Sequence, residues 1–394
     1  MENKKIAKIL NETIVPNAIG QEVTIAEDLS NISELGVAFA DMDIDDVKSY
    51  MKDFMLGVYY DWLEGKTFEE ETFGMYVTRE EFAAVWGHLR ARMIPAMDSH
   101  ITTLVSKYAD SNAPDYTDGH FYGIQTDQIF LPNTKSFKLA HSWGFEYYKK
   151  CFTNAEDMRK LAAEFEKCAE DSATYMLNEL ARTNICELAV AAYEGGRKIQ
   201  LLTLYNAKHG YQSGDPGYID ITNWDLSPEF KLFCQAVVIK LKKYIRNLNN
   251  KYNDGTIPNF TPEKFVRSVL LTEFAVELDF NQSVVYHQQL VDIGQHYDID
   301  FWQNQTQELM PFIEEGSQFD SIVTTTGAGN EATTTTYSHI MGVIFDRYSA
   351  IIKEDLNKIT EKPVPEEDFV TLFHHYSKSY GIDTRESGIV LVLE

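Results

Sequence analysis

The sequence predicts an α+β fold, on two observations. Segments with the three- and four-residue spacing of apolar residues that is typical of helices are mixed with short apolar runs that are typical of strands. Their order shows no regular strand–helix–strand repeat, which a parallel α/β sheet would require. With 394 residues, 44% of them hydrophobic and 24% charged, the chain is long enough to bury a sizeable core or two.

The charge excludes several classes of partner. The chain has 35 Lys and Arg against 60 Asp and Glu, a net charge of −25. Such a chain repels phosphate, which disfavours a nucleic-acid groove and an anionic membrane surface. No apolar run approaches the ~20 residues of a membrane span, and no signal peptide fits the N-terminus. We therefore expect a soluble protein made in the cytoplasm.

The N-terminal third combines short helices with an extended excursion. Residues 1–75 are acidic and weakly periodic, with a helical spacing of apolar residues over 47–58. A capping box of Thr78 and Glu81 predicts a helix over 79–97. Residues 113–148 alternate short aromatic runs with Gly and Pro, which predicts a protruding β-hairpin with its turn near 132–134.

A very long helix is the clearest element. Thr153 and Glu156 form a capping box, helical periodicity continues to Ala192, and Gly195-Gly196 is a helix stop signal. About 40 residues at 1.5 Å per residue give a rod of roughly 60 Å. Asn184 is a candidate for a kink or an early end.

The C-terminal half mixes both kinds of element. We expect irregular chain over 198–223, a helix from Ser227 to Ile245 with cations at its C-terminal end, a helix from Thr261, a strand over 276–280, a linker over 324–337, a buried strand over 339–345 and two closing strands over 368–380 and 388–393. The cations suit the helix macrodipole and a solvated face. Pro363 and Pro365 predict a break before the closing strands.

No motif in the sequence predicts a catalytic, cofactor-binding or metal site. The G-x-G-x-x-A of residues 327–332 is followed by four threonines, which are poor helix formers, so a loop is favoured over a dinucleotide site. The Asp41–Asp45 stretch lacks the Gly and Glu of a calcium loop. His374 and His375 are adjacent and would point to opposite faces of a strand.

The four cysteines show no metal-binding spacing either. They are Cys151, Cys168, Cys186 and Cys234, each among apolar neighbours. We expect buried free thiols in a reducing compartment.

Four stretches become informative together with the order of the elements. They are 144–152 (GFEYYKKCF), 152–180 (FTNAEDMRKLAAEFEKCAEDSATYMLNEL), 341–355 (MGVIFDRYSAIIKED) and 373–394 (FHHYSKSYGIDTRESGIVLVLE). In this order they resemble the returning strand of the extended loop, the spine helix, a late axial-domain strand and the closing peripheral-domain strands of tailed-phage major capsid proteins of the Hong Kong 97 type. The resemblance covers residues 76–394.

The resemblance implies an α+β fold of the Hong Kong 97 type, with peripheral and axial domains, a long spine helix, an extended β-hairpin loop and an N-terminal arm. It assigns 1–75 to the arm, 76–150 to the extended loop, 151–196 with 364–394 to the peripheral domain, and 197–363 to the axial domain. The spine helix is 154–194.

The function that the resemblance implies is structural. The chain would be the major capsid protein of a tailed bacteriophage, located in the virion and made in the cytoplasm of a bacterial host. It would assemble into hexamers and pentamers of an icosahedral shell around double-stranded DNA, without enzyme activity, cofactor or metal. Its partners would be copies of itself, a portal and a separate scaffolding protein. DNA would be enclosed cargo rather than a sequence-specific ligand, and no membrane partner is expected.

Four aromatic residues of the excursion are the candidate contacts between subunits: Phe121, Tyr122, Phe130 and Phe137. The alternative is that they fold back onto their own subunit. Two other functions stay open on sequence alone, an intracellular acidic α+β hydrolase that uses Asp or Glu, and a portal or connector subunit of a virion.

Overall fold

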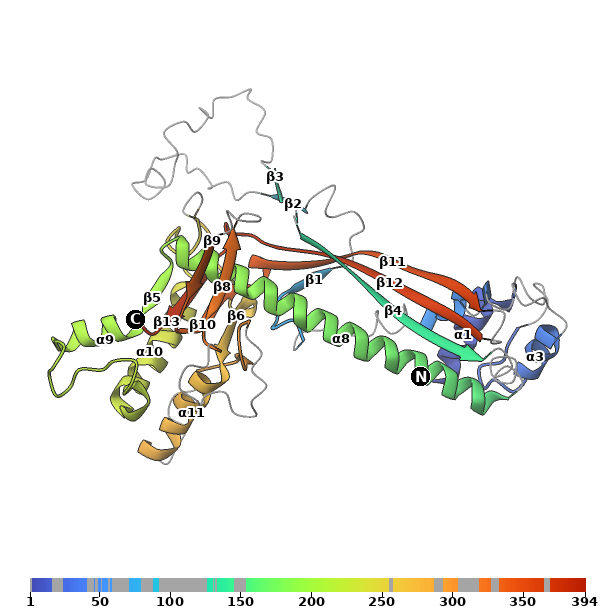
Figure 1. The fold of residues 1–394 in the computed structure, drawn as a ribbon, viewed down its shortest axis with the longest axis horizontal. Helices are drawn as coiled ribbons and strands as arrows, with labels where there is room; N and C mark the ends of the chain where they lie inside the picture. Colours follow the sequence, from blue (N-terminus) through green and yellow to red (C-terminus); the bar gives the residue numbers. More distant parts are fainter. Residues whose placement is uncertain are drawn as a thin grey trace, which may run out of the picture.

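The structure is a computed structural model. It describes residues 2–15, 24–40, 46, 49–50, 52–55, 57–58, 71–78, 88–91, 126–129, 131, 133–144, 154–254, 258–286, 293–303, 319–326, 333–364 and 369–394. The molecule is elongated, and one helix runs along most of its length (Figure 1). The predicted mixture of helices and strands without a regular alternation is confirmed.

The long helix, α8, spans Ala155–Glu194. Its cap is Asn154, whose side chain accepts a hydrogen bond from the Glu156 amide at 3.1 Å, and Gly196 beyond its end has a φ of +71°. Asn184 neither kinks nor ends the helix. It is buried, and its Nδ2 donates to the Ile351 carbonyl oxygen at 3.3 Å, so this polar side chain ties α8 to the sheet beside it.

A four-stranded sheet lies along α8. Its order is β1 (Tyr76–Thr78), β11 (Ala350–Val364), β12 (Phe369–Ile382) and β4 (Asn133–Gly144). The long strands β11 and β12 form an antiparallel hairpin that pairs from Ala350 with Ile382 to Val364 with Phe369. Both contact α8, and they extend beside it toward its N-terminal end (Figure 1).

A five-stranded sheet forms the centre of the other half of the molecule. Its order is β5 (Lys198–Gln200), β13 (Gly388–Val392), β10 (Ile340–Asp346), β6 (Val266–Leu271) and β7 (Tyr297–Ile299). Strand β10 is central and buried at every position, as the apolar run over 339–345 predicts. It pairs antiparallel with β13 and β6.

Three of the described helices and a 3-10 turn also lie in this half. They are α9 (Leu201–His209), η1 (Trp224–Leu226), α10 (Pro228–Tyr244) and α11 (Thr272–Tyr286). The Ser227 hydroxyl oxygen accepts from the Phe230 amide and caps α10 at the predicted start. Together with the C-terminal half of α8 and the sheet, these elements enclose the main core.

Two predicted elements of this half are wrong in type. The predicted helix from Thr261 is only a 3-10 turn, η2 (Glu263–Phe265), before strand β6. The predicted strand over 276–280 lies inside α11, where Phe274 and Leu278 are buried one helical turn apart. Short apolar runs satisfy both periods, and the pairing of β6 with β10 decides between them.

Two predicted irregular segments also contain regular structure. Residues 198–223 include β5 and α9, and the described ends of the predicted linker over 324–337 belong to an antiparallel pair, β8 (Ile322–Thr326) and β9 (Thr333–Tyr337). The threonines of that pair are β-branched, which favours strands.

The excursion does not pair as the predicted hairpin. Strand β3 (Thr126–Ile129) pairs with β2 (His88–Ala91), and β4 pairs along its whole length with β12. The helix predicted over 79–97 is therefore wrong at 88–91. Pairing with β3 overrides the local helical pattern there.

A separate cluster covers the N-terminal end of α8. Helices α1 (Asn3–Thr13) and α3 (Ile32–Ala40) lie beside that end of α8 in Figure 1, and residues of 6–58 form a core with Met158, Leu161 and Phe165. The Phe54 and Phe165 rings lie 6.2 Å apart. The described part of 1–75 thus buries apolar surface on its own chain. Its predicted contact with a neighbour stays a prediction.

Candidate functional site

The four predicted contact residues divide unevenly. Phe121, Tyr122 and Phe130 lie outside the described residues. Phe137 is on β4, half-buried, and packs against the main core of its own chain. The Lys135 ammonium lies 5.2 Å from the centre of its ring. A role for these residues between subunits stays a prediction.

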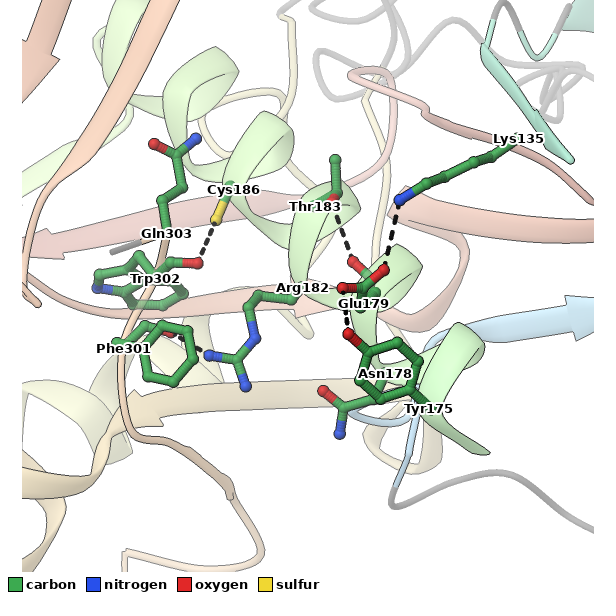
Figure 2. A pocket seen from close by; sticks show the side chains of 10 residues that line it. All are labelled: Lys135, Tyr175, Asn178, Glu179, Arg182, Thr183, Cys186, Phe301, Trp302 and Gln303. Atoms are coloured by element: carbon green, nitrogen blue, oxygen red, sulfur yellow. Dashed lines mark hydrogen bonds and ion pairs between the residues drawn. The ribbon is translucent and has the colours of Figure 1, made fainter. Parts of the chain in front are cut away.

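A pocket of about 360 Å³ lies where the two halves of the molecule meet. Its lining comes from one face of α8, from β4 and from the segment after β7 (Figure 2). The residues are Lys135, Tyr175, Asn178, Glu179, Arg182, Thr183, Cys186, Phe301, Trp302 and Gln303. Residues far apart in sequence meet here because β4 and β7 approach α8 from different sheets.

One wall of the pocket is a polar cluster centred on Glu179. The Lys135 ammonium lies 3.4 Å from its Oε2, and the Tyr175 hydroxyl donates to its Oε1 at 3.0 Å (Figure 2). The same interaction raises the pKa of Tyr175, because the hydrogen bond and the negative charge of Glu179 favour the neutral phenol. The Tyr175 side chain is 67% exposed, so an aromatic ring stands at the pocket mouth.

The opposite wall is Arg182. Its Nη1 donates to the Phe301 carbonyl oxygen at 2.6 Å, and its guanidinium lies 3.9 Å from the centre of the Phe301 ring. Burial lowers the pKa of Arg182, which Asp300 and Glu179 partly offset. Arg182 therefore joins the long helix to the segment beyond β7 by both a charged hydrogen bond and a cation–π contact.

We expect Arg182→Met to lower the free energy of unfolding by about 1–2 kcal/mol, because the Phe301 carbonyl loses a charged donor while the apolar stem is kept. Urea denaturation followed by fluorescence measures this. The control is Arg159→Met, an exposed arginine on the same helix, for which a change within about 0.5 kcal/mol is expected. Equal effects of the two substitutions would show that the contacts of Arg182 with Phe301 do not stabilise the folded chain.

An acidic cluster lies on the α11 side of the main core. Burial raises the pKa of Glu273 to about 7, with further contributions from Asp320, Glu277 and Asp225. The negative charge of these carboxylates is balanced in part, because the Lys231 ammonium lies 2.5 Å from Glu277. The cluster is therefore a place where the folded chain holds a proton near neutral pH.

Glu273→Gln is expected to change the pH dependence of stability. The folded pKa lies above the usual 4.5, so the folded state binds more protons and stability falls as pH rises from about 4.5 to about 7. The variant lacks this loss. Between pH 5 and pH 8 its free energy of unfolding should therefore rise by about 1 kcal/mol relative to that of the wild type. This is less than the full pKa shift would give, because solvent screens the partly exposed side chain. Denaturation midpoints at both pH values measure it. Glu164→Gln, exposed on α8, is the control and should show no such gain.

The structure adds no support for a dinucleotide, calcium or metal site at the three motifs considered above. The glycines of 327–332 and Asp41–Asp45 lie outside the described residues, and His374 and His375 are consecutive residues of β12. Within the part of the chain that the structure describes, no three His, Cys, Asp or Glu side chains gather as metal ligands. Among the helices so described, none combines the length and apolar character that crossing a bilayer demands.

The predicted burial of the cysteines is confirmed for Cys186 and Cys234 and is wrong for Cys168, which is only half-buried. These three residues form no disulfide, and Cys151 lies outside the described residues. Burial raises the pKa of Cys186 to about 12 and that of Cys234 well above its usual value, so neither is a reactive thiolate.

Two cores lie along one long helix in this chain. The model of the Phi29-like phage major capsid protein family matches residues 102–392. This covers well over half of the chain, and the chain belongs to that family. It is a tailed-phage major capsid protein with a structural, non-enzymatic role, as the resemblance implied, and the hydrolase and portal alternatives find no support.

Solved phage capsids are similar to the chain in outline. The capsid structure of Staphylococcus phage Andhra is 11% identical with a TM-score of 0.45, over 80% of this chain and 83% of that one. The capsid structure of Cyanophage P-SCSP1u is 8% identical with a TM-score of 0.42, over 83% and 88%. Both TM-scores lie below 0.5, so the family assignment rests on the sequence match. No curated protein matches the sequence significantly.

The pocket is the part of the site that sequence reasoning missed. Lys135, Glu179 and Phe301 come from three distant segments, and none lies in a recognisable motif. The available signal was the set of polar residues on one face of the long helix at 175–183, which an entirely solvated helix face would also show.

Proposed function

We propose that the chain forms the hexameric and pentameric capsomers of an icosahedral shell around double-stranded DNA, with a fold of the Hong Kong 97 type. The family match over 102–392 carries this proposal. The long α8 with a long sheet beside it, and the compact half around the five-stranded sheet, support a division into peripheral and axial domains.

The sheets suggest domain boundaries that differ from those drawn from sequence. The predicted boundary at 363/364 falls inside the β11–β12 hairpin, and β13 belongs to the sheet of β10. We therefore assign α8, β1, β4, β11 and β12 to the peripheral domain, and 197–346 with 388–394 to the axial domain. Residues 79–132 are the remaining candidate for the extended loop.

The partners follow from the same proposal. Neighbouring copies would be embraced by the extended loop, with Phe121, Tyr122 and Phe130 as contacts and Phe137 at its base. A portal and a separate scaffolding protein would complete the assembly, which takes place in the bacterial cytoplasm. The net charge of −25 favours DNA as enclosed cargo, because a negative wall does not hold phosphate.

Electron microscopy of the protein co-expressed with its neighbouring genes tests the proposal. Closed shells or hexameric capsomers are the expected result. Rings of about a dozen subunits, or only monomers and dimers under every condition, would overturn it. Replacing Phe121 and Tyr122 by serine should reduce the yield of shells while the far-ultraviolet circular dichroism of the subunit is unchanged.

A further inference from the structure

The chain has one strongly basic stretch. Residues 240–267 contain seven Lys and Arg against two Asp and Glu, a net charge of +5. The other 366 residues therefore carry a net charge of −30, which together with +5 gives the total of −25. This stretch begins in the last turns of α10 and ends in β6.

Apolar side chains are exposed in the same place. The Asn249 and Asn259 backbones exchange hydrogen bonds of 3.0 and 2.9 Å, and the Thr261 amide donates to the Ile245 carbonyl oxygen at 3.0 Å. This pairing brings Leu248 opposite Phe260. Leu248 itself follows Tyr244 by four residues. All three are exposed, by 50% at Tyr244, 45% at Leu248 and 47% at Phe260.

Exposed cations flank this apolar group on both segments. Lys243 adjoins Tyr244, Lys251 follows the pairing of Asn249, and Lys264 follows Phe260 in sequence. We call these six residues, Lys243, Tyr244, Leu248, Lys251, Phe260 and Lys264, the basic aromatic patch.

The helix macrodipole accounts for one of these three cations, Lys243, which lies in the last turn of α10. Lys242 does serve the local structure, since its ammonium donates to the Ile293 and Gln295 carbonyl oxygens at 3.0 Å each. Lys251 and Lys264, however, lie beyond the end of α10. An ordinary solvated face also does not explain why Phe260 and Leu248 are both exposed opposite each other.

We propose that the basic aromatic patch binds an acidic surface of a second copy of this chain. An apolar, aromatic centre with a charged rim is the usual anatomy of a protein interface. Its positive charge is complementary to a chain that is negative elsewhere, and the shell of the proposed function, on which this inference rests, supplies that second copy. A phosphate backbone would need donors at the centre of the patch, where Leu248 and Phe260 lie.

Site-specific photo-crosslinking tests this contact. Phe260 is replaced by p-benzoylphenylalanine in the full chain, co-expressed with its neighbouring genes, and irradiated both before and after particles form. Leu226, which is 76% exposed in the same half of the molecule, receives the same replacement as the control. Crosslinked products are identified by mass spectrometry.

The expected result is a crosslink from position 260 to an Asp- or Glu-rich peptide of a second copy, with little product from position 226. Reversing two charges of the patch, in Lys243→Glu with Lys251→Glu, should lower the yield about tenfold, because like charges then oppose. Lys167→Glu with Lys208→Glu makes the same change in net charge at exposed positions elsewhere and should leave the yield unchanged.

Crosslinking of position 260 to DNA, equal products from both positions, or no intermolecular product would overturn the inference. These outcomes are separate from the failure of the proposed function. If shells assemble and no crosslink forms, the proposed function stands and the proposed contact is refuted. If crosslinked dimers form but never close into shells, the contact stands and the proposed function is refuted.

Discussion

Replacing Trp302 by alanine is expected to lower the free energy of unfolding by about 3–5 kcal/mol, because a large, fully buried side chain leaves a cavity. The residue also holds elements together, through its indole and through its backbone. Its Nε1 donates to the Ile340 carbonyl oxygen at 2.8 Å at the start of β10, and the Trp302 carbonyl accepts from the Cys186 thiol of α8 at 3.5 Å. Guanidinium denaturation measures the loss.

Two matched variants separate the contributions. Trp302→Phe keeps most of the buried area and removes the indole donor, so the cost should be about 1–3 kcal/mol for the unpaired Ile340 carbonyl and the lost volume. Leu226→Ala removes an exposed side chain and should change stability by less than about 0.5 kcal/mol. A Trp302→Ala effect as small as that of Leu226→Ala would show that the pocket wall is not packed as described.

Gly342→Ala is expected to destabilise the central strand β10 by about 1–3 kcal/mol. A Cβ at this position would lie 2.5 Å from Leu270 Cδ2 and 2.8 Å from the Val269 carbonyl oxygen, both on the adjoining strand β6. The leucine tip can turn away, but the backbone oxygen cannot move without breaking the pairing of β10 with β6. Thermal unfolding followed by circular dichroism measures the effect.

The same sheet contains the control for this substitution. Gly388 begins β13, and a Cβ there would first meet Leu188 Cδ1 at 3.4 Å, an ordinary contact. Gly388→Ala should therefore be near neutral. Similar losses for both substitutions would point to a general intolerance of side chains in this sheet, and the specific crowding against β6 would be refuted.

Elements whose periodicity extends over many residues were predictable. Helix α8 repeats its apolar stripe for 40 residues, so the local pattern alone decides it. Strand β10 was predicted from a short run that is rich in Ile, Val and Phe, residues that favour strands. The six residues of β6 satisfy helix and strand periods equally, and only β10 beside them selects the strand. Likewise the partner of β4 is β12, about 230 residues later, which no local rule can supply.

The site was less predictable than the fold for a related reason. Cysteine burial follows from apolar neighbours along the sequence, and it could be predicted for Cys186 and Cys234. The pocket depends on contacts such as that between Arg182 and Phe301, which are 119 residues apart. The raised pKa of Glu273 likewise depends on burial and on Asp320, which is distant in sequence.

The two cores on one helix make α8 a lever. Forty residues at 1.5 Å each give a length of about 60 Å, so a rotation of one degree at the five-stranded sheet displaces the far end by about 1 Å. The N-terminal cluster and the main core contact different stretches of this rod. An angular change of a few degrees at one end would therefore displace the other end by several ångströms.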